Sequence, residues 1–226
     1  MIHLVSYFQT SVGNKVVVAL TGLGLVSFVM FHMLGNLQIF EGPSALNTYA
    51  AFLRDMPILL WAVRIGLLGI VIIHISLAIQ LSLRNRRARP IAYAAHTYRQ
   101  ASVASRTMAI SGGVLLLFVI VHLLHLTAGV IDPVSPDRVD IEGHRDVYGK
   151  VVHAFQNPLL VMLYIAGQLG LGLHVSHAVS SSLQTLGFEH AAFNRLFKAA
   201  GPTVALLIML GNTAIILAVY LGIVRA

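Results

Sequence analysis

The chain has 226 residues, of which 57% are hydrophobic and only 10% charged, and its mean hydropathy is +0.82. Soluble domains carry about 25% charged residues, so this composition excludes an ordinary soluble protein and indicates one that lies mostly in a lipid bilayer. The chain has no cysteine, which excludes disulfides, iron–sulfur ligation and covalent haem attachment through Cys-x-x-Cys-His.

Five apolar runs are each long enough to cross the hydrocarbon core of a bilayer, which takes about 20 helical residues. Only helices or closed barrels satisfy their backbone hydrogen bonds in lipid, and these runs are too long for barrel strands. We therefore predict an all-α integral membrane protein that forms a single membrane domain over residues 1–226. Its predicted transmembrane helices are 16–40, 58–83, 108–131, 158–183 and 202–224.

Charged residues in the loops predict the orientation. The loop 84–107 holds six arginines and no acidic residue, and positive charge marks the cytoplasmic side of a membrane protein. The first and third loops hold seven of the eight acidic residues, so we expect them outside. The N-terminus is then cytoplasmic and the C-terminus external, in the inner (cytoplasmic) membrane. Because the run RNRRARP is a topology signal, the net charge of +7 does not indicate a nucleic-acid partner.

Six of the eleven histidines lie inside the predicted spans, on the first four helices. An ionisable side chain is expensive in hydrocarbon, so one that lies there is interpreted first as functional. At about 1.5 Å rise per residue, His32 and His122 lie roughly 24–27 Å from the cytoplasmic ends of their helices. His74 and His174 lie roughly 26 Å from the outer ends of theirs. The remaining two are His125 and His177.

An internal repeat relates these helices in pairs. The segments FVMFHML around His32 and FVIVHLL around His122 share Phe-Val-x-x-His-x-Leu. The segments HISLA at His74 and HVSHA at His174 share His-x-Ser-x-Ala. The repeat therefore pairs His32 with His122 and His74 with His174. It leaves out the second histidine of the third and fourth spans, for which a haem edge, a quinone or a neighbouring helix all stay open as partners.

Two histidines at equal depth on different helices can supply the two axial nitrogens of a haem b. The pairs predict an outer haem held by His32 and His122 and an inner haem held by His74 and His174. The two levels would be roughly 15–20 Å apart in depth. For any single histidine, a hydrogen bond to a neighbouring helix is the alternative. Glycines would leave room for the macrocycle or serve ordinary helix packing, and they are Gly35, Gly66, Gly69, Gly112, Gly113, Gly167, Gly170 and Gly172.

Arg64 is a basic residue well inside a span, so it needs an anionic partner or a route for its charge to the interface. A propionate of the outer haem is the candidate partner. Arg106 and Lys15 are placed similarly for the inner haem, with interfacial anchoring as the alternative.

Several segments together resemble a known family. They are TSVGNKVVVALTGLGLVSFVMFHMLGNLQIF, ALNTYAAFL and the four paired histidines. They are similar to the cytochrome b subunit that anchors succinate dehydrogenase and fumarate reductase, in its single-chain, five-helix, two-haem form. The Ser-x-x-x-Lys and His-x-x-x-Asn of the first helix carry the resemblance most specifically, and it covers nearly the whole chain.

The resemblance implies the membrane anchor and electron-transfer subunit of succinate:quinone oxidoreductase, respiratory complex II, which catalyses succinate + quinone ⇌ fumarate + quinol. A flavoprotein subunit with FAD and an iron–sulfur subunit would bind on the cytoplasmic side and carry the dicarboxylate chemistry, so no catalytic residue for that chemistry is expected here. Two b haems would link the clusters to a quinone, which is menaquinone in most members.

By position, the resemblance makes His74 and His174 the ligands of the inner, proximal haem and His32 and His122 those of the outer, distal haem. Some fumarate reductases have a glutamate two residues before the fourth-helix ligand, where this chain has Gly172, so a proton path of that kind is not expected. The direction of the reaction in the cell and any higher oligomer of the heterotrimer stay open.

Polar groups near the predicted outer haem are the candidates for binding quinone carbonyls, and they are Asn47, Arg64, His125 and His153. A cytoplasmic site near Ser11, Lys15 and Arg106 is the alternative.

Two other functions of the whole protein stay open. One is a two-haem anchor of another respiratory dehydrogenase, such as a formate dehydrogenase or a hydrogenase. The other is a haem-free transporter with a histidine proton relay, although transporters often show inverted repeats and this repeat is parallel.

Overall fold

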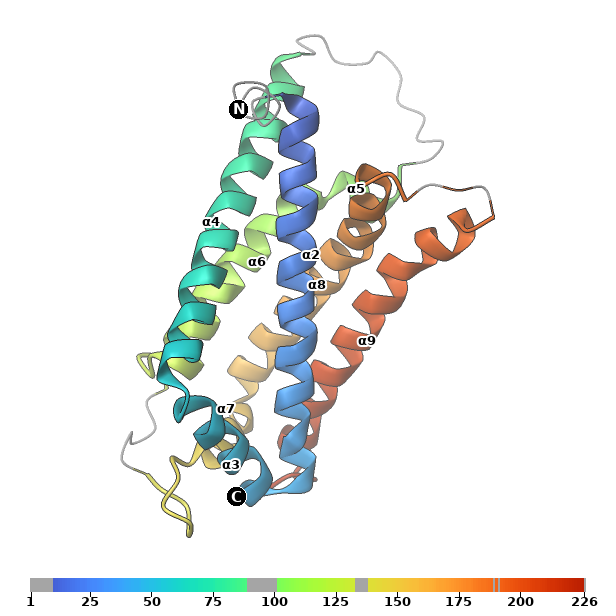
Figure 1. Cartoon of the computed structure of the whole chain (residues 1–226). Helices are drawn as coiled ribbons and strands as arrows, with labels where there is room; N and C mark the ends of the chain where they lie inside the picture. Colours follow the sequence, from blue (N-terminus) through green and yellow to red (C-terminus); the bar gives the residue numbers. More distant parts are fainter. Residues whose placement is uncertain (1–9, 89–100, 133–137, 189, 191, 226) are drawn as a thin grey trace.

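The computed structural model describes residues 10–88, 101–132, 138–188, 190 and 192–225, and these residues form helices and no strand. Five helices are long and apolar enough to span a membrane, which confirms the predicted class of multi-pass, all-α protein. They alternate in direction along one bundle (Figure 1). They are α2 (Ser11–Asn36), α4 (Pro57–Arg87), α6 (Met108–His122), α8 (Pro158–Thr185) and α9 (Asn194–Tyr220).

Short helices connect or end the long ones. They are η1 (Leu37–Glu41), α3 (Pro43–Arg54), α5 (Val103–Arg106), the π-helical turn η2 (Leu123–Thr127) and α7 (Val147–Gln156). Of these, α3, α5 and α7 lie in predicted loops, whereas η1 and η2 lie at the ends of the predicted spans 16–40 and 108–131. The chain turns into α3 at Gly42, whose φ of +105° favours glycine. Asp146 caps α7, because its Oδ1 accepts a hydrogen bond from the backbone N–H of Gly149 at 2.7 Å.

The two ends of the bundle differ in charge. The basic end, near the N-terminus in Figure 1, carries Lys15, Arg84, Arg86, Arg87 and Arg106. The acidic end, formed by η1, α3, α7 and the segments beside them, carries Glu41, Asp55, Asp132, Asp140, Glu142 and Asp146. The predicted orientation depends on this separation of basic and acidic residues. That the basic end faces the cytoplasm stays a prediction. Arg89, Arg99 and Asp137 lie outside the described residues.

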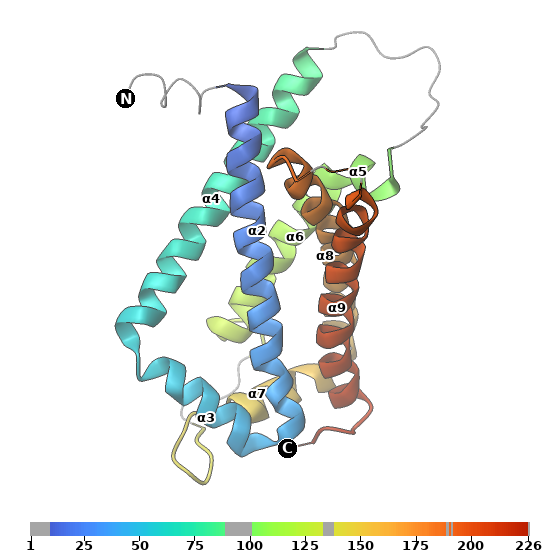
Figure 2. The ribbon, with the colours of Figure 1, turned by 45° about the vertical axis from the view of Figure 1, so that its right-hand side comes forward.

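Packing is uneven among the five long helices. α8 and α9 share the most extensive contact, and α2 packs against both. Ile208 of α9 is fully buried in this contact region, together with Met33 of α2 and Val175 of α8. The fifth helix is therefore part of the packed core. By contrast, α4 has no buried residue, packs mainly along α2, and diverges from it towards the acidic end (Figure 2).

The fifth helix begins at Asn194, well before the predicted start at residue 202, and it contains Pro202. A proline lacks the N–H that would bond to the carbonyl four residues earlier, which here belongs to Lys198. The hydroxyl of Ser180 on α8 donates to that carbonyl at 3.2 Å and accepts from the N–H of Gly201. Neighbouring hydroxyls can satisfy the backbone groups that a proline frees in a membrane helix. The proline is thus tolerated inside α9.

Replacing Ser180 by alanine tests this arrangement. We expect Ser180→Ala to lower the free energy of unfolding in detergent by about 1 kcal/mol, which lowers Tm by about 2–4 °C. In a Pro202→Ala background the restored N–H can bond to Lys198, so the same change should cost less. Ser176→Ala is the control, because that hydroxyl donates to Leu173 of its own helix. An equal cost in both backgrounds would contradict the role of Ser180.

Candidate functional site

The four histidines paired by the repeat lie on helices that pack one against the next in the order α4, α2, α8, α6, which makes a ring that is open between α6 and α4. In this order α2 is opposite α6, and α4 is opposite α8. The repeat therefore pairs histidines across the two diagonals of the ring, where side chains from opposite helices can approach the same point. This is the arrangement from which cofactor sites inside helix bundles are built.

The pair towards the acidic end is His32 on α2 and His122 at the end of α6. Their ring centroids are 6.0 Å apart and their planes are at 89°. A metal–imidazole bond is about 2 Å long, so two rings that ligate one metal ion from opposite sides have centroids roughly 6 Å apart. The separation suits a shared metal ion. One turn earlier in each helix, Phe28 stacks on His32 and Phe118 packs against His122, which explains the phenylalanine of the repeat.

The pair towards the basic end is His74 on α4 and His174 on α8. The Nδ1 atom of His74 lies 3.1 Å from the hydroxyl of Thr21 on α2. The Nδ1 atom of His174 lies 3.1 Å from the hydroxyl of Ser111 on α6. Each ring is thus held through Nδ1 by the helix beside its own.

Sequence reasoning missed Thr21 and Ser111, although a signal was present. Aligning His32 with His122 also aligns Thr21 with Ser111 and Gly22 with Gly112. The repeat therefore extends to Thr/Ser-Gly-x5-Phe-Val-x-x-His-x-Leu. Small polar residues are common in membrane helices, so only their contacts with the two histidines show what they do.

The glycines have several roles. A Cβ atom at Gly22 would lie 3.1 Å from Cε1 of His74, and one at Gly112 would lie 3.4 Å from Cε1 of His174. These two glycines let the imidazoles lie close to the neighbouring backbone. Others serve contacts between helices, since a Cβ at Gly167 would overlap Phe118, one at Gly172 would overlap Met209, and Gly35 and Gly170 face Tyr49 and Val114. Around Gly66, Gly69 and Gly113 there is open space.

His125 follows His122 in the π-helical turn η2 and is only 1% exposed. Its Nδ1 lies 2.9 Å from the hydroxyl of Tyr164 on α8, and that hydroxyl is also 3.4 Å from Nδ1 of His122. Of the partners left open by the sequence, the structure therefore gives His125 a neighbouring helix. Lys150 of α7 donates to the carbonyl of Leu126 in the same turn at 3.0 Å. Burial, followed by the charge of Arg145, lowers the pKa of Lys150.

The basic residues proposed for haem propionates are all exposed. Arg64 on α4 lies over the Trp61 ring, with its guanidinium carbon 5.2 Å from the centroid. Aligning His74 with His174 places Arg64 at the position of Tyr164, so Arg64 belongs to the level of His32 and His122. Lys15 and Arg106 lie at the basic end, as their proposed role for the other pair requires.

The four quinone candidates do not form one cluster. Asn47 on α3 is fully buried; its amide accepts from the N–H of Tyr148 at 2.9 Å and donates to Asp146 at 3.4 Å. His153 on α7 is exposed and lies 3.5 Å from Asp132. No contact joins Arg64 to the other three candidates, all of which the structure describes.

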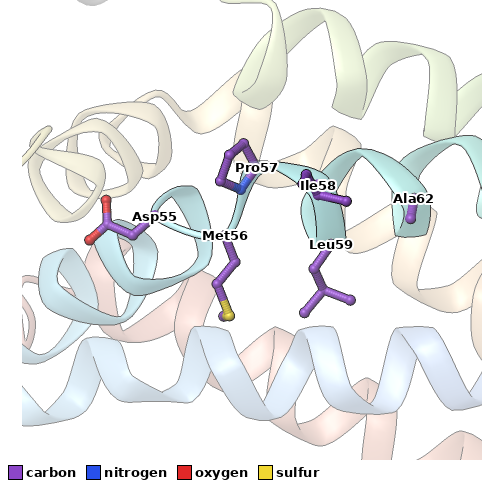
Figure 3. A pocket seen from close by; sticks show the side chains of 6 residues that line it. All are labelled: Asp55, Met56, Pro57, Ile58, Leu59 and Ala62. Atoms are coloured by element: carbon purple, nitrogen blue, oxygen red, sulfur yellow. The ribbon is translucent and has the colours of Figure 1, made fainter.

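A hollow of about 520 Å³ opens at the acidic end, where α3 leads into α4. It is a shallow hollow, open on one side rather than enclosed. The lining is apolar except for Asp55, and Figure 3 shows the side chains of Met56 and Leu59 extending to the same side of the chain. The lining residues are Asp55, Met56, Pro57, Ile58, Leu59 and Ala62.

Comparison with known proteins gives no relative: no family model, curated protein or solved structure matches the chain. The function proposed below therefore depends on the residues of this chain, on their geometry and on the resemblance of the segments quoted above.

Asn47 offers a test of its structural role. We expect Asn47→Ala to lower the free energy of unfolding by about 1–3 kcal/mol, because it leaves the buried N–H of Tyr148 without its acceptor. Thermal unfolding in detergent measures the change. Thr48→Ala is the matched control on the exposed side of α3, with an expected effect within about 0.5 kcal/mol. If the unfolding curves of the two variants coincide, Asn47 does not have this structural role, and quinone binding again becomes its candidate function.

Proposed function

We propose that the chain is the cytochrome b membrane anchor of a succinate:quinone oxidoreductase, respiratory complex II, and that it carries electrons between the iron–sulfur subunit and quinone. The observation that carries this proposal is the pairing of histidines across both diagonals of the helix ring, towards opposite ends of the bundle. The 6.0 Å separation of the His32 and His122 rings and the Nδ1 hydrogen bonds of His74 and His174 support it.

Each pair would hold one haem b through its two imidazole rings, His32 and His122 one haem and His74 and His174 the other. A metal-bound histidine usually has its second ring nitrogen hydrogen-bonded, which fixes the orientation of the ring. The contacts at Nδ1 leave Nε2 of His74 and His174 for the metal ion. Haem b bound there would supply one-electron redox chemistry inside the membrane.

The charge distribution supports the proposed side of the membrane on which the partner subunits dock. If the basic end is cytoplasmic, as positive-inside charge predicts, the flavoprotein and iron–sulfur subunits dock there, nearest His74 and His174. The C-terminus is then external, and the protein lies in the inner (cytoplasmic) membrane. Lipid surrounds the exposed apolar side chains of α4, for example Ile58, Ile65 and Ile72.

Quinone, proposed to be menaquinone, binds towards the acidic end. The hollow at the start of α4 supports this placement, because its lining is almost entirely apolar and it lies on the same helix as Arg64. A direction of succinate oxidation with menaquinone is uphill, and transfer of charge across the membrane can drive it, since one charge through 100 mV is worth about 2.3 kcal/mol.

A two-haem anchor of another respiratory dehydrogenase is the alternative, because the same histidine geometry would serve it. Purification of the chain with its natural partners distinguishes the two. Flavin, iron–sulfur clusters and succinate-dependent reduction support the proposal, whereas molybdenum or nickel in the complex supports the alternative.

Haem content and its dependence on single histidines test the proposal. We expect a dithionite-reduced difference spectrum with b-type bands and two haems per chain. His32→Ala and His122→Ala should lose the same haem, and His74→Ala and His174→Ala the other. His125→Ala and His177→Ala are the matched controls and should keep both. A protein without b-type bands, or with both haems retained in the His74 variant, contradicts the proposal.

The side of the quinone site is tested in the whole complex. We expect Arg64→Leu to slow quinone turnover several-fold and to leave succinate-dependent reduction of artificial dyes unchanged, because the dyes accept electrons from the partner subunits. Lys15→Leu at the basic end is the comparison. If Lys15→Leu alone slows quinone turnover, the site belongs to the basic end instead.

A further inference from the structure

We infer that Thr21 and Ser111 are positioning residues that fix the tautomer of His74 and His174 and thereby set how strongly these rings bind their metal ion. This inference rests on the proposed function, since it concerns the haem that the two histidines would share. It adds a task for two hydroxyls that neither the sequence motifs nor the family resemblance singled out.

The direction of the hydrogen bond to His74 follows from the other contacts of Thr21. A hydroxyl has one proton to donate and two lone pairs with which to accept. The Oγ1 atom of Thr21 lies 2.7 Å from the carbonyl oxygen of Val17 and 3.1 Å from that of Val18. Carbonyl oxygens only accept, so the hydroxyl proton is directed to its own helix. The 3.1 Å contact with His74 then needs its proton from Nδ1 of the ring.

Ser111 repeats this logic on the other side of the bundle. Its hydroxyl donates to the carbonyl of Met108 at 3.1 Å and lies 3.1 Å from Nδ1 of His174. A neutral imidazole carries one N–H. With that proton at Nδ1 in both rings, Nε2 keeps its lone pair, which is the form that ligates a metal ion.

The glycine that follows each hydroxyl completes the arrangement. Gly22 and Gly112 are close to Cε1 of the respective rings, where a Cβ would be tight at 3.1 Å from His74 and in van der Waals contact at 3.4 Å with His174. Hydroxyl and glycine together define both the hydrogen bond and the position of the ring. These pairs lie on α2 and α6, which carry the histidines of the other haem, so each of the two helices serves both sites.

The consequence for the metal ion is a stronger ligand. Donation from Nδ1 raises the basicity of the imidazole, and a more basic ligand favours oxidised iron over reduced iron. Thr21 and Ser111 contact the two ligands of one proposed haem, whereas at the other site the hydroxyl of Tyr164 lies near Nδ1 of both His122 and His125. Loss of the Thr21 or Ser111 hydroxyl should therefore raise the midpoint potential of one haem only.

The test uses the purified complex with Thr21→Val, which keeps the shape of the side chain, and Ser111→Ala. We expect each to raise the midpoint potential of the same haem, the one that His74→Ala removes, and to leave the potential of the other unchanged. A tenfold weaker preference for oxidised iron corresponds to about 59 mV for one electron. Retention of that haem should weaken about tenfold or more. Thr21→Ser and Ser111→Thr keep the hydroxyl and should restore both properties.

The outcomes separate this inference from the proposed function. If the unsubstituted protein has no haem, both are overturned. If it has two haems and their potentials are the same in Thr21→Val and Ser111→Ala as in the parent, the inference alone is overturned. A shift confined to the haem of His32 and His122 also overturns it. Should Thr21→Val fail to fold, Ser111→Ala decides, because serine and alanine differ only by the hydroxyl oxygen.

Discussion

The structure depends on one constraint, which is that a polar group in hydrocarbon must have a partner. An unsatisfied backbone or side-chain group costs several kcal/mol there. Hydrogen bonds within the helices satisfy most backbone groups. Side-chain hydroxyls bond to a backbone carbonyl that has no partner in its own helix and to histidine rings. Ser180 serves the carbonyl that Pro202 frees, and Thr21 and Ser111 hold the rings of His74 and His174. In each case the hydroxyl links two neighbouring helices, so satisfaction of polar groups also sets how the helices are placed.

The ring order of the helices follows from where small and large side chains meet. α8 carries the glycines that receive Phe118 and Met209 from α6 and α9, so it lies at the centre and has the most buried residues. The glycines of α4, Gly66 and Gly69, receive no side chain, and α4 has no buried residue. Its place in the ring is defined mainly by α2, through contacts that include Thr21 with His74 and Asn14 with Gln80. The helix with the weakest packing thus carries one of the four paired histidines.

Much of the architecture could be predicted from the sequence because hydrocarbon imposes length and apolarity on every span. The five helices and the histidine pairing came from that rule and from the repeat. Other features depend on contacts that composition does not encode. Pro202 inside α9 is served by Ser180 from another helix, and Asn47 joins α3 to the start of α7. The sequence left two roles open for the eight glycines, room for a macrocycle or helix packing. Of these eight only Gly112 faces a paired ring, and Gly22, which was not among them, faces the other.

The two halves of the repeat agree at one level and differ at the other. Towards the basic end, Thr21 with His74 matches Ser111 with His174 in residue type, distance and neighbouring glycine. Towards the acidic end, the position of Tyr164 in one half is Arg64 in the other. A buried phenol holds His122, whereas the corresponding arginine is exposed beside the divergent part of α4.

Both halves of the repeat keep a hydroxyl beside a histidine ring towards the basic end, which is expected if both hydroxyls position a ring. Towards the acidic end the halves differ at Arg64 and Tyr164, so these two residues can have different roles. At that level Arg64 and the apolar hollow at the start of α4 lie on one helix, and α4 is the helix least fixed by packing. An exchangeable apolar ligand needs access from lipid, which a loosely packed helix at the edge of the ring provides. The asymmetry of the repeat therefore places the proposed exchange of an apolar ligand towards the acidic end, in addition to the haem proposed there for His32 and His122.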